Sequence, residues 1–312
     1  MTDYTIFYKS QLSVVGNWSK ENEWDLFISA YNSSKRVSDV FAKVRAGHKS
    51  WLLFPEYNYA ETEYSGLNNY YAGAYTNEAD YILGYVGTLN LNLSRIRICI
   101  DLTGFIRPYQ LFLTKLLWER GVKRFDALYS EPNVYKEREK TKFSSGAGGK
   151  VRQVAGFEGA HSANTSNDML IIGSGYDDEL IARVSYYKDA ARKIQIFGLP
   201  SLRADMYQEN ELRAQLAEES LGPSLSYFAP ANDPFVTASV LSEITRALEK
   251  QKQITNLYLS PLASKAQVLG FSLFHYLEGK QRPTSIIYPF RPHYSRETTE
   301  GLSRIWKYTV EV

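Results

Sequence analysis

Cysteine and histidine are scarce in this sequence of 312 residues. The one cysteine, Cys99, rules out an internal disulfide and a cysteine-rich metal site. It lies in the run Ile96–Ile100, where we expect a buried and unreactive thiol. The four histidines are dispersed, and none has the HxH or HExxH spacing of a zinc site. We therefore expect no metal centre.

Long hydrophobic segments are also absent. No stretch reaches the roughly 20 apolar residues that a membrane-spanning helix requires, and the first residues lack the pattern of a secretion signal. The net charge is only +2, which disfavours binding to duplex nucleic acid or to an anionic membrane through a global field. We expect a cytoplasmic protein without membrane partners.

The familiar signatures of nucleotide and hydrolase sites are missing as well. The sequence has no Walker loop, no complete GxGxxG fingerprint and no GxSxG nucleophile elbow. A standard ATP or NAD site and a serine hydrolase triad therefore gain little support, and the sequence names no cofactor.

Tyrosine, in contrast, is abundant, with 24 residues. A tyrosine ring offers a flat apolar face and a polar tip, which suits stacking on a base or contact with a protein partner. A tyrosine-rich edge of the core explains the excess equally well.

Short apolar runs alternate with amphipathic segments, the pattern of βα units that feed a parallel sheet. We expect strands at Asp25–Ala30, Ser50–Pro55, Tyr81–Gly87, Ile96–Leu102, Arg124–Tyr129, Asp168–Gly173, Lys193–Gly198, Asn256–Leu259 and Ser285–Pro289. We expect helices at Ser33–Val44, Pro108–Arg120, Asp178–Ala191 and Pro234–Lys250. The predicted class is α/β, with mainly parallel sheet flanked by helices in two Rossmann-like halves.

A segment rich in glycine and serine, residues 141–151, divides the chain. Such a composition favours a joint or a loop over regular structure. We expect an N-terminal Rossmann-like half at residues 1–140 and a C-terminal α/β half at residues 152–312. One large sheet instead of two remains open.

Four expected strand-to-helix junctions share a polar, small-residue composition. Their candidate ligand-binding residues are Ser29, Tyr31 and Asn32; Asp101, Thr103, Gly104 and Arg107; Gly173, Ser174 and Gly175; and Ser260 with Lys265. In doubly wound sheets such junctions line the ligand crevice, and helix N-termini favour anions. Each junction taken alone is more typical of an ordinary helix cap than of a ligand site. Together they predict one shared crevice for a phosphate-containing ligand.

Two carboxylates and two arginines complete the candidates. Glu56 and Glu131 each follow an expected strand and are candidates for acid–base catalysis, although a solvated loop or a turn also explains them. Arg291 and Arg296 lie in an aromatic-rich segment near the C-terminus that suits a phosphate or a carboxylate. Among the histidines, His161 is the first to test.

Two stretches resemble known families. Trp24–Tyr31, WDLFISAY, resembles the first strand and loop of Toll/interleukin-1 receptor (TIR) domains, some of which cleave NAD. Asp101–Gly104, with the following helix and the strand that ends at Tyr129–Pro132, is similar to ligand-side loops of CRISPR-associated Rossmann-fold (CARF) sensors. The second resemblance implies binding of a nucleotide messenger across a dimer crevice. No attached nuclease motif is found.

Three functions fit these observations. The first is a nucleotide-recognising sensor or accessory protein of a bacterial defence or signalling system. The second is an enzyme that cleaves NAD or a nucleoside phosphate through Glu56 or Glu131. The third is a non-catalytic subunit that docks on a larger protein or forms a homodimer through its aromatic surface.

Overall fold

The computed structural model describes residues 2–73, 76–135, 144–145, 149–203, 208, 212, 221–296 and 299–312. It divides the chain into two compact units, and both contain segments that are distant in sequence. Unit 1 comprises Met1–Ile6 with Gly149–Phe290, and unit 2 comprises Phe7–Gly148 with Arg291–Val312.

Unit 2 is built on a seven-stranded sheet in the order β1-β17-β6-β5-β2-β3-β4. Its strands are β1 (Tyr8–Leu12), β2 (Glu23–Ala30), β3 (Arg45–Leu52), β4 (Tyr70–Tyr71), β5 (Ile98–Asp101), β6 (Arg124–Glu131) and β17 (Arg304–Glu311). Its helices are α1 (Lys35–Lys43), α2 (Glu61–Tyr64), α3 (Glu78–Thr88) and α4 (Arg107–Glu119). Strands β2 to β6 are mutually parallel, whereas β17 is antiparallel to its neighbours β6 and β1. Two short ribbons complete the unit: β7 (Val134–Tyr135) with β16 (Thr299–Glu300), and β8 (Ser144–Ser145) with β15 (His293–Tyr294).

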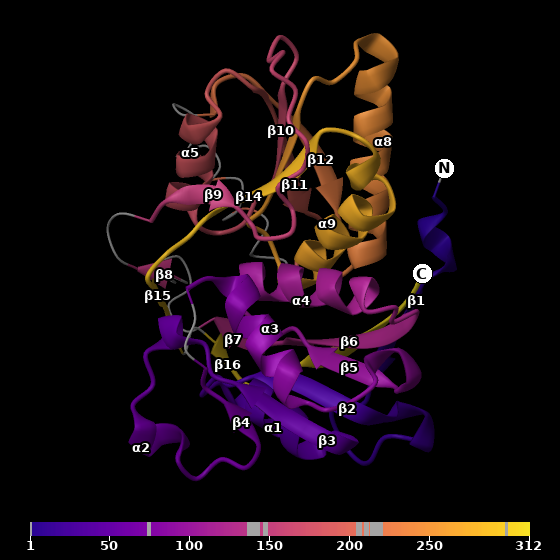
Figure 1. Ribbon diagram of the computed structural model, residues 1–312, viewed down its shortest axis with the longest axis vertical. Coiled ribbons are helices and arrows are strands. Elements are labelled where there is room, and N and C mark those ends of the chain that lie inside the picture. The colour runs from indigo at the N-terminus through magenta and orange to yellow at the C-terminus, as the bar shows by residue number, and fades with distance from the viewer. Residues whose placement is uncertain are drawn as a thin grey trace. The chain divides into compact units, whose positions relative to one another are not determined.

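Unit 1 is built on a six-stranded sheet in the order β12-β11-β10-β13-β14-β9. Its strands are β9 (Val151–Gln153), β10 (Met169–Gly173), β11 (Arg192–Gly198), β12 (Ser224–Ala229), β13 (Leu257–Pro261) and β14 (Thr284–Pro289). Its helices include α5 (Asp178–Tyr187), α8 (Pro234–Gln251) and α9 (Lys265–Leu277). All strands are parallel except β9, which is antiparallel to β14. Figure 1 shows α5 on one side of this sheet and the packed pair α8 and α9 on the other.

Both sheets are therefore mainly parallel and flanked by helices, which confirms the predicted α/β class. The strand order is also the same in both. In each sheet the first parallel strand lies in the middle, the next two lie on one side of it, and the following two lie on the other side. The chain reverses direction across the sheet beside the first strand, which is the hallmark of a doubly wound fold.

The core of unit 2 explains how α1 is fixed. Val40 of α1 packs with Phe27, Cys99 and Leu128, which come from the adjacent strands β2, β5 and β6. Alternate residues of a strand share a face. The residues two places further along these strands, Ser29, Asp101 and Ser130, therefore lie on the same face as α1.

One expected element is wrong. Tyr81–Gly87 forms most of helix α3 and not a strand. The aromatic and β-branched residues suggested a strand, but Asn77 caps the helix by accepting from the N–H groups of Ala79 and Asp80. Tyr81 and Tyr85 then lie one turn apart and are both buried.

The boundaries of the two units differ from those of the expected halves, residues 1–140 and 152–312. Residues 291–312 belong to unit 2 because β17 pairs with β6 along its whole length. The first six residues belong to unit 1, where Tyr4 is buried and its hydroxyl donates to Glu278. Of the expected joint 141–151, residues 141–143 and 146–148 lie outside the described residues, and Ser144–Ser145 form strand β8.

Candidate functional site

The point where each sheet reverses its strand order is the first place to look for a ligand site. In unit 2 this point lies between β2 and β5, and in unit 1 it lies between β10 and β13. Among the predicted residues, Ser29 and Asp101 are register partners on β2 and β5. Gly173 and Ser260 lie at the ends of β10 and β13. The junctions thus meet in pairs, one pair in each unit, and a single crevice for all four stays a prediction.

Asp101 is the centre of the unit 2 site. It is fully buried, and its Oδ2 accepts a hydrogen bond of 3.0 Å from the Ser29 hydroxyl. Its Oδ1 accepts from the backbone N–H of Thr103 at 3.0 Å. Burial raises the pKa of the carboxyl, although hydrogen bonds from the Thr103 hydroxyl, the Thr103 N–H and Ser29, together with the charge of Arg36, oppose the shift. Each carboxylate oxygen can accept more than one hydrogen bond, so Asp101 retains capacity for a ligand donor.

Thr103 links Asp101 to the next strand. Its hydroxyl accepts from the backbone N–H of Ser130 at 3.0 Å, at the end of β6. Gly104 follows, and a Cβ there would overlap the carbonyl oxygen of Ala30. The glycine is thus required by the close approach of the β2 end to the loop after β5. This is a packing reason and differs from the close approach of a ligand.

Arg36, on the first turn of α1, also reaches this edge, and the sequence analysis missed it. Its Nη1 donates to the carbonyl oxygen of Ser130 at 2.5 Å. The guanidinium also hydrogen-bonds Tyr129, whose pKa is raised by burial. The available signal was its place two residues after Ser34, in the loop already identified as a candidate.

The loop after β2 holds Tyr31 and Asn32 in local roles. The Oδ1 of Asn32 accepts from the N–H of Ser34 at 2.9 Å, a turn typical of a helix start. Tyr31 packs against Tyr59, with ring centroids 4.9 Å apart. Arg296 lies over the other ring, Tyr59, at 4.3 Å and donates to the carboxylate of Glu63. Arg296 is therefore bound within unit 2.

Glu56 and Glu131 have different surroundings. Glu56 accepts from the Tyr109 hydroxyl at 2.8 Å, and its other oxygen is buried without a hydrogen-bond partner. Burial raises its pKa, and the nearby Glu78 adds to the shift. Glu131 is also buried, but its carboxylate accepts from Trp306 at 2.7 Å and lies 3.5 Å from the guanidinium of Arg304. Of the two, Glu56 has the carboxylate with unused capacity.

Arg107 and Arg291 also belong to unit 2. Arg107 is the first residue of α4, and its charge lowers the pKa of Tyr129 against the effect of burial. Arg291 is buried at the start of the C-terminal segment. Both make interactions within the structure.

Most of the predicted unit 1 residues serve in packing, whereas the hydroxyl of Ser260 is fully buried without a hydrogen-bond partner. The Ser174 hydroxyl donates to Gln195 at 2.7 Å, and a Cβ at Gly175 would overlap the carbonyl oxygen of Leu262. Lys265 is the first residue of α9, which is capped by Ser264 through the N–H of Gln267. These contacts are those of a capped helix against a close-packed loop. His161 stacks on the ring of Tyr258, at a centroid distance of 5.4 Å.

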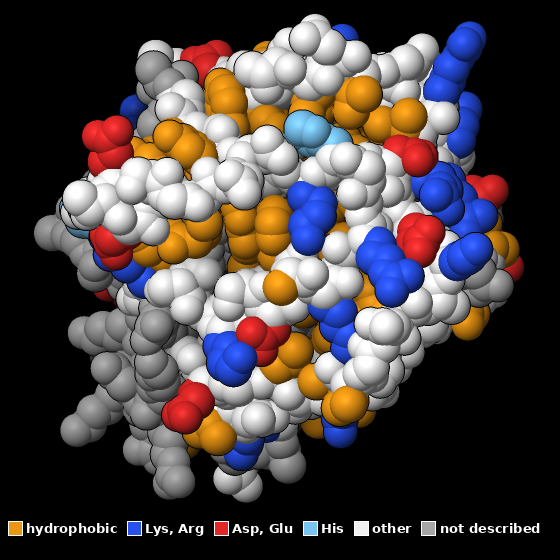
Figure 2. Space-filling model, turned by 90° about the horizontal axis from the view of Figure 1, so that it is seen from below, with side chains coloured by type: hydrophobic (Ala, Val, Ile, Leu, Met, Phe, Trp, Pro, Cys, Tyr) orange, Lys and Arg blue, Asp and Glu red, His pale blue; other side chains and the backbone are white. Residues whose placement is uncertain are grey.

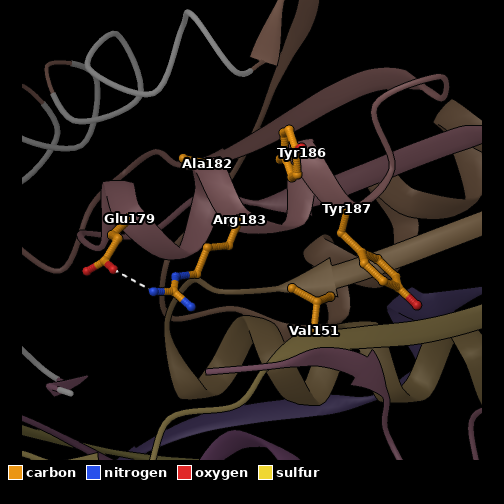
Figure 3. A pocket seen from close by; sticks show the side chains of 6 residues that line it. All are labelled: Val151, Glu179, Ala182, Arg183, Tyr186 and Tyr187. Atoms are coloured by element: carbon orange, nitrogen blue, oxygen red, sulfur yellow. Dashed lines mark hydrogen bonds and ion pairs between the residues drawn. The ribbon is translucent and has the colours of Figure 1, made fainter. Parts of the chain in front are cut away.

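A shallow groove of about 580 Å³ runs along α5 in unit 1. Figure 3 shows it with Val151 of β9 and the Glu179–Arg183 ion pair of 2.9 Å. The ring of Tyr186 beside it is 81% exposed. None of the residues singled out from the sequence lines it.

Three further observations concern surface charge, metal ligands and membrane-spanning helices. On the face shown in Figure 2, basic and acidic side chains are interspersed and form no continuous basic patch. In the part of the chain that the structure describes, no group of three His, Cys, Asp or Glu side chains is placed to hold a metal ion. Over the same residues, no helix is both long and apolar enough to cross a bilayer.

Comparison with known proteins assigns no family to this chain. No family model matches the chain, and no curated protein matches it. Two solved structures are weakly similar. One is a multidomain structure with adenylation, ketoreductase and pseudo-Asub domains of a keto acid-selecting NRPS module, at 8% identity and a TM-score of 0.24, covering 86% of this chain and 30% of that one. The other is a ketoreductase domain from the bacillaene assembly line, at 10% identity and a TM-score of 0.24, covering 86% of this chain and 69% of that one. Similarity at this level gives no basis for transferring an activity.

Proposed function

We propose that the protein is a nucleotide-recognising sensor or accessory protein of a bacterial defence or signalling system. The nucleotide binds at the carboxyl ends of β2, β5 and β6 in unit 2, beside Ser29, Asp101 and Thr103. The resemblance of Asp101–Gly104 to the ligand-side loops of CARF sensors supports the defence role.

One observation carries the binding proposal, the buried carboxylate of Asp101 at the strand-order reversal. Burying a carboxylate is costly unless its hydrogen bonds repay the desolvation. Over the described residues, Asp101 receives hydrogen bonds from Ser29 and Thr103 and feels the charge of Arg36, but no basic group lies within ion-pair distance of it. A ligand hydroxyl or amino group that donates to Asp101 explains why a charged side chain is retained there.

Calorimetric titration of the full chain tests the proposal with NAD, nucleoside phosphates, cyclic dinucleotides and cyclic oligonucleotides. We expect one class to bind, and Asp101→Asn to weaken it about 10- to 100-fold, the effect of losing a hydrogen bond to a charged acceptor. Asp39→Asn is the control, because Asp39 lies on the exposed face of α1 and pairs with Lys35. Failure of every ligand to bind contradicts the proposal.

A second candidate function is cleavage of NAD or of a nucleoside phosphate, favoured by the surroundings of Glu56. A carboxyl with a raised pKa and one unused oxygen suits general acid–base catalysis. Product analysis after incubation with these substrates tests it. Glu56→Gln should lower the turnover by about 100-fold or more, whereas Glu61→Gln, in the exposed helix α2, should not. An unchanged substrate pool contradicts this candidate.

A further inference from the structure

The guanidinium of Arg36 has one anionic group nearby, the carboxyl of Asp101, and the positive charge of Arg36 lowers the pKa of that carboxyl against the effect of burial. Within the described ranges, no carboxylate lies within ion-pair distance of it, and its Nε is buried without a hydrogen-bond partner. Its hydrogen bonds go to neutral groups, the carbonyl oxygen of Ser130 and the hydroxyl of Tyr129. A partly buried guanidinium that is held in place by hydrogen bonds to neutral groups retains capacity to bind an anion.

A second unused group lies beside it. The Ser130 hydroxyl is fully buried and makes no hydrogen bond, whereas both backbone groups of Ser130 are bonded, to Thr103 and Arg36. Ser130 shares its face of β6 with Leu128, which packs on Val40 of α1. The hydroxyl is therefore on the α1 side of the sheet, the side from which Arg36 comes.

The start of α1 adds a third feature. The N-cap residue, Ser34, makes no side-chain capping bond, and the Asn32 side chain bonds the N–H of Ser34. The carbonyl of Ser34 accepts from the N–H groups of Val37 and Ser38. The first turn of α1 thus presents the N–H groups of Lys35 and Arg36 and the positive end of the helix dipole.

We propose that Arg36, the Ser130 hydroxyl and the first turn of α1 bind one phosphate group of the ligand. This inference rests on the proposed function and narrows it, because the ligand must then be a phosphorylated nucleotide and not a nucleoside. Asp101, on the neighbouring strand, repels a phosphate and accepts from a neutral hydroxyl or amino group. Arg36 and Asp101 therefore orient the ligand, with its phosphate toward Arg36 and its sugar or base toward Asp101.

The test compares the four ribonucleoside 5′-monophosphates, the four nucleosides and inorganic phosphate by calorimetry on the full chain. Arg36→Gln should weaken monophosphate and inorganic phosphate binding about 10- to 100-fold, the usual effect of losing a charge-assisted hydrogen bond. Binding of the nucleosides should not change. Arg45→Gln is the matched control, because Arg45 pairs with Glu23 at the other ends of β2 and β3.

Ser130→Ala separates binding from folding. Because the hydroxyl has no partner in the free protein, removing it should leave the unfolding midpoint unchanged or higher. The same substitution should weaken monophosphate binding about 3- to 10-fold, as expected for a neutral hydrogen bond. A lower midpoint with unchanged binding assigns a structural role to Ser130 and counts against the subsite.

The outcomes distinguish the two proposals. If monophosphates bind equally to wild type and to Arg36→Gln, the phosphate subsite is overturned and the nucleotide function stands. If inorganic phosphate binds, Arg36→Gln abolishes that binding, and neither the monophosphates nor the NAD and cyclic nucleotides of the first titration bind, the subsite stands and the nucleotide function falls. If no probe of either titration binds to the wild type, both fall.

Discussion

The Ser29 hydroxyl donates a 3.0 Å hydrogen bond to the Asp101 carboxylate, and this bond joins the two strands that flank the reversal of strand order in unit 2. Both residues are fully buried. A polar pair in this position is expensive to bury, and it lies where doubly wound sheets bind their ligands. If the proposed nucleotide binds here, the pair lowers the stability of the fold and contributes to binding at the same place.

Asp101→Asn should stabilise the protein at neutral pH. Burial raises the pKa of Asp101 above its ordinary value, so the folded state resists its ionisation. The cost is absent in acid, where the carboxyl is protonated in both states; it grows as the pH rises above the ordinary pKa and is complete above the raised, folded pKa. We expect the variant to be about 1 kcal/mol more stable at pH 7 and equal to wild type near pH 3. Urea unfolding at several pH values measures this, and a loss of stability at pH 7 contradicts it.

Gly104→Ala should destabilise unit 2. The added methyl group overlaps the carbonyl oxygen of Ala30, so the end of β2 or the loop after β5 must shift. We expect a loss of about 2 kcal/mol or more, together with weaker nucleotide binding. Gly87→Ala is the control, because a Cβ there meets nothing and an alanine favours helix α3. It should stabilise by about 0.5–1 kcal/mol. Equal effects at both positions would count against this account.

Glu131→Gln should affect stability and not binding. The Glu131 carboxylate accepts from the Trp306 indole and lies beside Arg304, so both partners from β17 depend on its charge. We expect a loss of about 1–2 kcal/mol, measured by urea unfolding, with unchanged nucleotide affinity. If the variant folds normally but loses binding or turnover, the prediction is wrong and Glu131 has a functional role.

Unit 1 should be acid-sensitive through Glu278. Burial alone raises the pKa of this carboxyl, but hydrogen bonds from Ser242, Arg246 and Tyr4 outweigh burial and lower it. The stabilisation is therefore present above its ordinary pKa and is lost as the pH falls through the lower, folded value. Glu278→Gln should lose about 1–2 kcal/mol at pH 7 and show a flatter dependence between pH 5 and about 3. Arg282 pairs with Glu249 on the same unit, so Glu249→Gln, in a more exposed pair, is the control.

The alternation of strands and helices could be predicted from the sequence because hydrophobic periodicity and segment length are local properties of the chain. β2, β5, β6, β10, β11, β13 and β14 were all expected within a few residues of their bounds. The prediction of a strand at Tyr81–Gly87 was wrong because the residue types of this segment favour a strand. The N-cap at Asn77 and the burial of Tyr81 and Tyr85 on one face stabilise a helix there instead. β17 was not expected at all, since its place between β1 and β6 comes from pairing with distant strands.

The candidate site divides in the same way. Residues at or just after strand ends, such as Ser29, Asp101 and Thr103, were identified because strand ends can be predicted from the sequence. Arg36 and Ser130 were missed, since nothing local shows that the Arg36 Nε or the Ser130 hydroxyl is buried without a hydrogen-bond partner. Gly104 and Gly175 were assigned to ligand approach, but only packed neighbours reveal that other backbone segments require them.

The sequence by itself determined the α/β class, the central strands of both sheets, most of the longer helices, and the polar strand ends, because hydrophobic periodicity and capping residues act over a few neighbours. The tertiary structure decided which strands are adjacent, to which unit each terminus belongs, and which polar groups have partners. Those properties depend on contacts between residues far apart in the chain, and burial and unsatisfied hydrogen bonds exist only once these contacts form.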